Sequence, residues 1–298
     1  EMSASLVGSE MCIRDRDLQV VSKKIGSGLA KYVKNNDPVP VYMEKGISCL
    51  EVFMGSLYAG GFYSLLNAGL PKMRLEQIIN VLDVDYVVTD NEHLESAKEF
   101  FPNKKLILYE DLVNSEIDEE LLAGIRAKKL DVDPVYANFT SGSTGVPKGV
   151  VVGNRSIIDF IDNFTSTFGI NETDIIANQA PFDFDVSVKD IYPALKTGAT
   201  LVIVPKELFS RPAELIDFLV EHKVTTMTWA VSALCLISTF HGLDYKVPET
   251  VKRVMFSGEV MPMKHLKEWM KHLPNATFVN LYGPTEICLL YTSPSPRD

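Results

Sequence analysis

A short segment rich in glycine and hydroxyl side chains is the part of the sequence best suited to chemistry. It reads Tyr136-Ala-Asn-Phe-Thr-Ser-Gly-Ser-Thr-Gly-Val-Pro-Lys-Gly-Val150. Glycine lets a backbone approach an anion closely, and successive backbone N–H groups can form an anion-binding concavity. Lys148 adds a point charge. The segment therefore predicts a polyphosphate-binding loop, although an ordinary Ser/Gly hairpin turn has a similar composition.

The loop differs from the two common phosphate-binding motifs. A Walker A loop ends in Gly-Lys-Ser/Thr, whereas Lys148 here follows Pro147 and precedes Gly149. A dinucleotide-binding fingerprint opens a helix, whereas the valines at 150–152 predict a strand after this loop. The segment therefore belongs to neither motif.

A second segment places carboxylates in an apolar frame. Asp183 and Asp185 alternate with Phe182, Phe184 and Val186. A buried carboxylate is costly unless a cation or hydrogen-bond donors satisfy it. In a pocket, that cation can be the ammonium group of a ligand. Alternatively, either carboxylate caps the helix that follows.

The composition excludes several classes of protein. The 298 residues are 46% hydrophobic and 23% charged, which is typical of a globular chain with a large core. The net charge of −10 argues against a dedicated nucleic-acid binder. No uncharged apolar run reaches the length of a membrane span, so none is expected. Cys49 and Cys235 lie in apolar settings without metal-ligand spacing, which indicates a reducing, cytoplasmic location.

Helical and strand patterns alternate along the chain and predict an α/β fold with a mostly parallel sheet. The predicted strands cover residues 39–43, 85–89, 105–109, 174–179, 200–204, 225–229, 251–256 and 277–280. The predicted helices cover residues 18–33, 49–62, 75–82, 93–100, a segment from near Asp118, 154–168, 187–195, 212–222 and 262–272.

Two motifs resemble the adenylate-forming superfamily, which includes amino-acid adenylation domains, acyl-CoA synthetases and luciferases. They are Thr140-Ser-Gly-Ser-Thr-Gly-Val-Pro-Lys-Gly149 and, later in the chain, Asn280-Leu-Tyr-Gly-Pro-Thr-Glu286. The resemblance covers roughly residues 17–287. It implies the large N-terminal domain of an adenylating enzyme, truncated, with stacked, mostly parallel sheets and flanking helices.

The resemblance implies ATP and Mg²⁺ as cofactors and gives each motif residue a role. Thr140 and Lys148 act on the phosphates, and Glu286 offers a hard oxygen ligand to Mg²⁺; these three are the expected catalytic residues. Tyr282 offers an aromatic face to adenine, and Thr285 a hydroxyl to the α-phosphate. The other expected nucleotide-binding residues are Ser141, Gly142, Ser143, Thr144, Gly145, Asn280, Leu281, Gly283 and Pro284.

The acidic segment resembles the one with which amino-acid-adenylating members bind the α-amino group of their substrate. Phe184-Asp185-Val186-Ser187 matches it, so Asp185 is the implied amine-binding residue. Acyl-CoA synthetases usually carry a histidine-containing segment here, and its absence favours an amino acid. By resemblance, Ser257, Gly258 and Glu259 line the adenine and substrate region; a plain strand-to-helix turn is the alternative for Ser257.

Within that branch, residues 185–193 and 256–262 look closer to D-alanine–carrier-protein ligases than to nonribosomal peptide synthetase modules. The latter tend to carry Trp-Glu where Lys189 and Asp190 stand, and the simplest expectation for Lys189 is a solvent-facing position. The resemblance thus implies a ligase that forms an aminoacyl-AMP, D-alanine favoured. It then transfers the aminoacyl group to the phosphopantetheine thiol of a carrier protein. A peptide-synthetase adenylation domain, an acyl-CoA synthetase and a non-catalytic nucleotide-binding remnant remain open.

The two ends of the chain do not continue the family pattern. Residues 1–16 and 288–298 resemble translated sequencing-adapter sequence, so both tails are left outside the predicted fold. A genuine N-terminal arm and a Ser/Pro tail are the alternative. By resemblance, a hinge and a small C-terminal domain with a catalytic lysine belong beyond residue 287. The 17–287 domain is therefore expected to be incomplete at both ends and inactive alone.

Overall fold

The computed structural model describes residues 5–7, 12–140 and 146–283. The chain divides into two compact units. Unit 1 comprises residues 1–15, 160–181 and 185–298, and unit 2 comprises residues 16–159 and 182–184. The segment 17–287, expected as one domain, therefore falls into two units.

Unit 2 contains a six-stranded sheet in the order β6-β5-β3-β4-β7-β8. All of its neighbouring strands are parallel except β7 and β8, which form an antiparallel pair. The strands are β3 (Pro38–Tyr42), β4 (Phe62–Leu65), β5 (Tyr86–Thr89), β6 (Lys105–Leu108), β7 (Pro134–Thr140) and β8 (Lys148–Gly153). The helices are α1 (Asp15–Leu29), α2 (Ile47–Tyr58), α3 (Lys72–Leu82), α4 (Leu94–Phe100), α5 (Tyr109–Leu112) and α6 (Glu119–Arg126).

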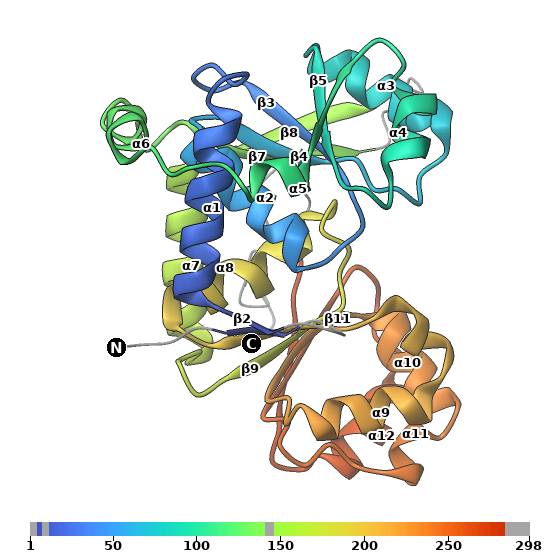
Figure 1. Cartoon of the computed structure of the whole chain (residues 1–298). Coiled ribbons are helices and arrows are strands. Elements are labelled where there is room, and N and C mark those ends of the chain that lie inside the picture. Colours follow the sequence, from blue (N-terminus) through green and yellow to red (C-terminus); the bar gives the residue numbers. More distant parts are fainter. Residues whose placement is uncertain (1–4, 8–11, 141–145, 284–298) are drawn as a thin grey trace. The chain divides into compact units, whose positions relative to one another are not determined.

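The core of unit 2 forms where α3 and α4 pack beside β5 (Figure 1). Leu75, Ile78 and Ala97 from the two helices meet Val87 of the strand in one apolar cluster. The helical spacing of Leu75 and Ile78 brings both onto one face, which is the face that the sheet covers.

Strand β4 corrects the sequence analysis, which assigned residues 49–62 to one helix. The helix α2 ends at Tyr58, and Phe62 begins the strand. Gly60, with a φ of +86°, turns the chain between them. The error has a physical cause, because periodicity cannot separate a buried helix from a buried strand when nearly every residue is apolar.

Unit 1 contains a seven-stranded sheet in the order β13-β12-β11-β9-β10-β1-β2, with only the β1–β2 pair antiparallel. The strands are β1 (Ser5–Val7), β2 (Cys12–Arg14), β9 (Ile175–Asn178), β10 (Thr200–Ile203), β11 (Thr226–Ala230), β12 (Arg253–Ser257) and β13 (Thr277–Asn280). The α-helices are α7 (Asn154–Phe168, which begins in unit 2), α8 (Val188–Thr197), α9 (Pro212–Glu221), α10 (Val231–Thr239), α11 (Gly242–Tyr245) and α12 (Met263–His272). The 3₁₀ helices are η1 (Asp185–Ser187) and η2 (Lys206–Ser210).

The helices α9, α10 and α12 lie beside the unit 1 sheet (Figure 1). Two buried tryptophans belong to the apolar cluster that joins these helices to the sheet. Trp229 on β11 donates its indole N–H to the carbonyl of Ala177, at 2.8 Å. Trp269 on α12 donates to the carbonyl of Leu234 on α10, at 3.0 Å. Each ring adds a large apolar area without leaving an unsatisfied donor. The predicted α/β architecture, with mostly parallel sheets and flanking helices, is confirmed.

The N-terminal segment also departs from expectation. Ser5–Val7 pairs in parallel with β10, and Cys12–Arg14 pairs with it in turn, although residues 1–16 were left outside the fold. The exposed edge of β10 offers unpaired backbone groups, which a passing segment can satisfy. The adapter interpretation stays a prediction, and the tail 288–298 lies outside the described residues. Among the helices that the structure describes, none is long and apolar enough to cross a bilayer.

Candidate active site

The predicted phosphate loop connects β7 and β8 of unit 2. The two strands form an antiparallel hairpin in which Thr140 lies opposite Lys148. The carbonyl of Thr140 accepts a hydrogen bond from Arg74 Nη2 at 3.0 Å, and Lys148 is exposed. The strand predicted after the loop is confirmed. Ser141, Gly142, Ser143, Thr144 and Gly145 lie outside the described residues, so phosphate binding stays a prediction.

The predicted amine-binding residue lies in unit 1, close to the carboxyl ends of parallel strands. Asp185 begins η1 and is 7% exposed. Ser257, another predicted substrate residue, ends β12 and is 8% exposed. Parallel α/β sheets bind their ligands at this edge. Both residues therefore occupy positions suited to a ligand site.

Lys189 corrects the sequence analysis, because its side chain is buried rather than solvent-facing. The residue lies in the first turn of α8 and is only 2% exposed. Its ammonium Nζ lies 3.5 Å from Ser257 Oγ. The face of α8 that carries Val188 and Ile191 is also buried, which brings Lys189 into the interior with them.

Burial makes the Lys189 ammonium group easier to deprotonate, but most of it stays protonated at neutral pH. Desolvation lowers the pKa of Lys189 to about 8, while Asp190 and Asp185 oppose that shift. Asp190 is itself fully buried and accepts a hydrogen bond from Asn178 Nδ2 at 2.8 Å. Two carboxylates and one ammonium thus lie buried in one neighbourhood.

Asp183 has a different environment from Asp185 and belongs to unit 2. Asn67 Nδ2 donates a hydrogen bond to its Oδ1 at 3.1 Å, and burial raises the pKa of the Asp183 carboxyl. The N-cap of α8 is Ser187, which makes no side-chain capping bond. Neither aspartate is therefore the N-cap of that helix.

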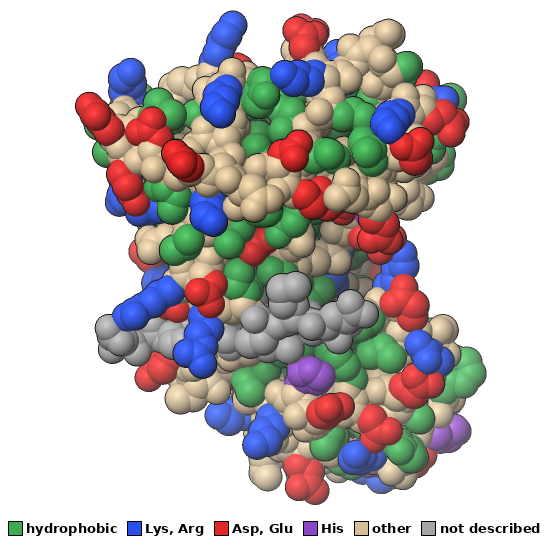
Figure 2. Space-filling view, in the orientation of Figure 1, with side chains coloured by type: hydrophobic (Ala, Val, Ile, Leu, Met, Phe, Trp, Pro, Cys, Tyr) green, Lys and Arg blue, Asp and Glu red, His purple; other side chains and the backbone are tan. Residues whose placement is uncertain are grey.

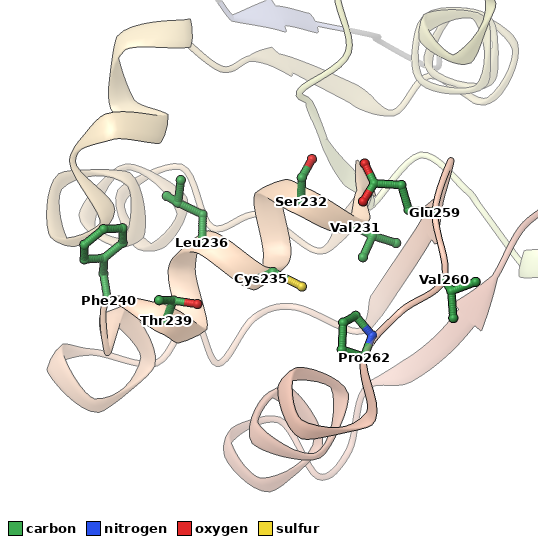
Figure 3. Close-up of a pocket in the computed structure, with 9 residues that line it drawn as sticks. All are labelled: Val231, Ser232, Cys235, Leu236, Thr239, Phe240, Glu259, Val260 and Pro262. Atoms are coloured by element: carbon green, nitrogen blue, oxygen red, sulfur yellow. The ribbon is translucent and has the colours of Figure 1, made fainter.

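The turn after β12 leads to a hollow of about 420 Å³ in unit 1. Gly258 has a φ of +96°, which only glycine adopts without strain. Glu259 lines the hollow together with one side of α10, including Ser232 and Cys235 (Figure 3). Burial, assisted by Glu259, raises the pKa of the Cys235 thiol. The sequence analysis singled out Glu259 but missed α10, whose continuous apolar run has no clear period.

The second motif begins at the end of β13, also in unit 1. Asn280 ends the strand and is exposed, and Leu281 N donates to the carbonyl of Phe256 at 2.8 Å. The Leu281 side chain is 2% exposed and packs in the core, whereas Tyr282 is 76% exposed. Tyr282 is therefore accessible to a stacking ligand. Gly283 is the last described residue, and Pro284, Thr285 and Glu286 lie outside the described residues.

The structure brings some predicted site residues together. In unit 1, Asp185 and Ser257 both lie near Lys189, which was not a predicted site residue: Lys189 Nζ lies 3.5 Å from Ser257 Oγ, and the charge of Asp185 raises the pKa of Lys189. In unit 2, Thr140 and Lys148 face each other across the hairpin. On the face that Figure 2 draws, acidic and basic side chains are interspersed rather than gathered by sign.

Comparison of the sequence with known proteins identifies relatives in one enzyme family. Residues 16–298 match the profile of the AMP-binding enzyme family. The chain is 31% identical over 282 residues to a D-alanine–D-alanyl carrier protein ligase of Bacillus velezensis, covering 93% of this chain and 54% of that protein. The corresponding ligase of Bacillus cytotoxicus is 30% identical over 280 residues, covering 89% and 52%. The chain thus spans about half the length of the curated relatives it matches.

Solved structures show the same fold. The nonribosomal peptide synthetase FmoA3 matches with a TM-score of 0.86 and 24% identity, covering 99% of this chain and 32% of that one. VinN matches with a TM-score of 0.80 and 19% identity, covering 95% and 71%. The resemblance to the adenylate-forming superfamily is confirmed, and the chain belongs to the AMP-binding enzyme family.

Proposed function

We propose that the chain is the nucleotide- and substrate-binding part of a ligase that activates an amino acid with ATP, with D-alanine as the favoured substrate. The observation that supports this most is the position of Asp185, which is buried at the start of η1 in the segment that resembles the amine-binding segment of amino-acid-adenylating enzymes. A carboxylate there can pair with an ammonium group, and the α-amino group of an amino acid supplies one. The relatives named above are D-alanine–D-alanyl carrier protein ligases.

The proposed reaction has two steps. A carboxylate oxygen of the amino acid attacks the α-phosphorus of ATP, the bond from that phosphorus to the bridging oxygen breaks, and pyrophosphate leaves. The thiol sulfur of a carrier-protein phosphopantetheine then attacks the acyl carbon, and AMP leaves as a carbon–sulfur bond forms. Positioning and charge stabilisation supply most of the catalysis in such a reaction.

The hairpin of unit 2 fits a role in holding ATP. Thr140 and Lys148 face each other at the two ends of the loop, so a hydroxyl and an ammonium flank the same segment. These two residues and the loop at 141–145 would hold the pyrophosphate group, and Glu286 would ligate Mg²⁺. Tyr282 would stack on adenine, for which its exposed ring is suited. We also propose a cytoplasmic location, where ATP and carrier protein meet.

Binding is the most direct test of this proposal. Since the chain spans about half the length of its relatives, we expect turnover by the chain alone to be weak. Calorimetric titration should show that ATP binds and that D-alanine binds at saturating ATP. Asp185→Asn should weaken D-alanine binding at least about tenfold and leave ATP binding unchanged, because only the amine loses its counter-ion.

Asp183→Asn is the matched control, since Asp183 lies in the same segment and accepts its hydrogen bond from Asn67. It should leave both affinities within about twofold of wild type. Binding of a fatty acid in preference to any amino acid would favour an acyl-CoA synthetase instead. ATP binding without any carboxylic acid ligand would favour a nucleotide-binding remnant.

A further inference from the structure

Three side chains of the types that bind metal ions meet where α11 and α12 lie close together in unit 1 (Figure 1). They are Asp244 of α11 and Glu268 and His272 of α12. One ligand atom from each lies within 4.8 Å of the other two. Among the residues that the structure describes, this is the one such group of histidine, cysteine and carboxylate side chains. We call it the α11–α12 cluster.

The helix α12 presents two of these side chains on one face. Glu268 and His272 are four residues apart, so they lie one above the other on the helix. The same spacing places two metal ligands side by side on zinc-binding helices. The His272 side chain is 14% exposed, and that of Asp244 is 52% exposed. The cluster is therefore enclosed on the α12 side and open to solvent on the α11 side.

The ring of His272 is oriented as a metal ligand would be. Its Nδ1 donates a hydrogen bond to the carbonyl of Glu268 at 3.0 Å, because a carbonyl oxygen can only accept. The other ring nitrogen, Nε2, lies 3.3 Å from Asp244 Oδ1. Metal-binding histidines commonly donate their second ring N–H to a backbone carbonyl in this way. A lone pair on Nε2 and one on Oδ1 repel each other unless a proton or a metal ion lies between them.

The contact distance and the ligand types both suit zinc. A tetrahedral zinc ion with bonds of about 2.0–2.2 Å holds its ligand atoms about 3.3–3.6 Å apart. The separation of 3.3 Å between His272 Nε2 and Asp244 Oδ1 matches that spacing. An imidazole ligand favours zinc and other transition metals, whereas Mg²⁺ and Ca²⁺ take oxygen ligands. The carboxyl end of α12, where His272 lies, also carries the negative end of the helix dipole.

Two further charged groups border the α11–α12 cluster. Lys271 Nζ lies 3.6 Å from Glu268 Oε1, and His241 Nδ1 lies 2.9 Å from Asp244 Oδ2. The Lys271 and His241 side chains are both well exposed. Because solvent weakens exposed ion pairs, a divalent ion can displace either partner.

We propose that Asp244, Glu268 and His272 bind a divalent transition-metal ion of the zinc type, with water completing its coordination. The ion would tie α11 to α12. The site is separate from the nucleotide and substrate residues, because α12 leads from the carboxyl end of β12 to the amino end of β13 and His272 is its last residue. This inference goes beyond the proposed function and does not depend on it.

Calorimetric titration of the 298-residue chain with ZnCl₂, in a buffer without chelators, tests the site. His272→Gln removes the imidazole, and Asp244→Asn removes a half-exposed carboxylate with little risk to the fold. The matched control is His222→Gln. His222 Nδ1 also donates to the carbonyl four residues earlier, that of Phe218 at 2.9 Å, but no carboxylate of the described residues lies within 4.0 Å of its ring. Circular dichroism establishes that each variant is folded.

Wild type should bind Zn²⁺ at a site that His272→Gln and Asp244→Asn each weaken about tenfold or more, while His222→Gln leaves it within about twofold. The visible absorption of bound Co²⁺, which depends on its nitrogen ligands, should change in His272→Gln and not in His222→Gln. Equal Zn²⁺ binding by wild type and both site variants would overturn the inference, as would an equal loss in His222→Gln. No Zn²⁺ binding by wild type would also overturn it and would identify a proton on His272 as the cation of the cluster.

Discussion

The buried charged residues at the two ends of the unit 1 sheet differ in how closely they contact a partner. At the amino ends of β9, β11 and β12, Asp174 and Arg253 form a close ion pair at 2.7 Å. At the carboxyl ends of β9 and β12, Lys189 lies buried near Asp185 and Asp190, and its Nζ lies 3.5 Å from Ser257 Oγ. Among the described residues of the same sheet, one end therefore holds a buried ion pair in close contact, and the other holds a buried lysine with a longer contact.

The amino end is a closed network. Asp174 also accepts a hydrogen bond from Thr225 Oγ1 at 2.8 Å and from the backbone N–H of Asn171 at 3.0 Å. Arg253 donates to Thr226 Oγ1 and to the carbonyl of Gly169. These bonds tie three strands and the turn after α7 to one carboxylate. Such saturation leaves little for a ligand to add, so we interpret this end as structural.

At the carboxyl end, the buried ammonium group of Lys189 has a longer contact than the ion pair at the amino end. The buried groups there are charged: Asp190 accepts a hydrogen bond from Asn178, and the Lys189 ammonium lies 3.5 Å from Ser257 Oγ. The contact distance of the buried cation, rather than burial alone, therefore distinguishes this end from the structural ion pair.

The largest expected effect on the free energy of unfolding comes from the Asp174–Arg253 ion pair at the amino end of the sheet. Asp174→Ala should lower the free energy of unfolding by about 3–5 kcal/mol, because it leaves the Arg253 guanidinium partly buried without its counter-ion. Urea denaturation measures the change. A loss below about 1 kcal/mol would mean that the network is no more stabilising than a surface ion pair.

The next largest effect is a pH dependence of the free energy of unfolding that comes from Lys189, at the carboxyl end of the sheet. Burial lowers the pKa of Lys189 to about 8 from 10.5, so between these values the unfolded chain binds the proton that the folded chain has released. Stability should therefore rise with pH in this window, by roughly 3 kcal/mol for wild type relative to Lys189→Met. Denaturation of both proteins at pH 7 and pH 10.5 measures it, and parallel pH profiles would contradict it.

A smaller effect is expected when one hydrogen bond of the closed network is removed. Thr225→Val keeps the shape of the side chain but removes the donor to Asp174 and the acceptor for the N–H of Ile175. We expect a loss of about 1–2 kcal/mol in the free energy of unfolding. Thr225→Ser, which retains the hydroxyl, is the control and should lose less than Thr225→Val.

The smallest effect is expected at an exposed ion pair outside both ends. Asp217 accepts from Lys246 at 2.7 Å, and both side chains are well exposed. Asp217→Ala should change the free energy of unfolding less than any of the three preceding variants, because solvent screens the pair. A loss comparable to that of Asp174→Ala would undermine the distinction between buried and exposed pairs.

Much of the fold could be predicted from local sequence. The strand at 277–280 and the helix starting near Asp118 coincide with β13 and α6, and Asp118 caps that helix through the N–H of Leu121. In these segments strand-forming residues or a capping side chain specify the structure locally. In contrast, β4 and α10 were missed because continuous apolar runs carry no period that separates helix from strand.

The candidate site was predictable in part. The motifs singled out Asp185, Ser257 and the loop followed by a strand that became β8, without any structure. The burial of Lys189 was not predictable, because a lysine flanked by apolar and acidic residues is usually solvent-facing and only packing of α8 shows otherwise. Contacts between segments distant in sequence, such as Lys189 with Ser257, need the fold itself.

Hydrogen exchange of the chain, measured with and without ATP and D-alanine, distinguishes the two ends of the unit 1 sheet. We expect that the amino acid, added to ATP-saturated chain, slows exchange in peptides covering residues 178–190 and 254–259. We also expect no change in the peptides around Asp174 and Gly169, where the closed network already protects the backbone. Protection at the amino end alone, or no added protection from any amino acid despite bound ATP, would contradict the account.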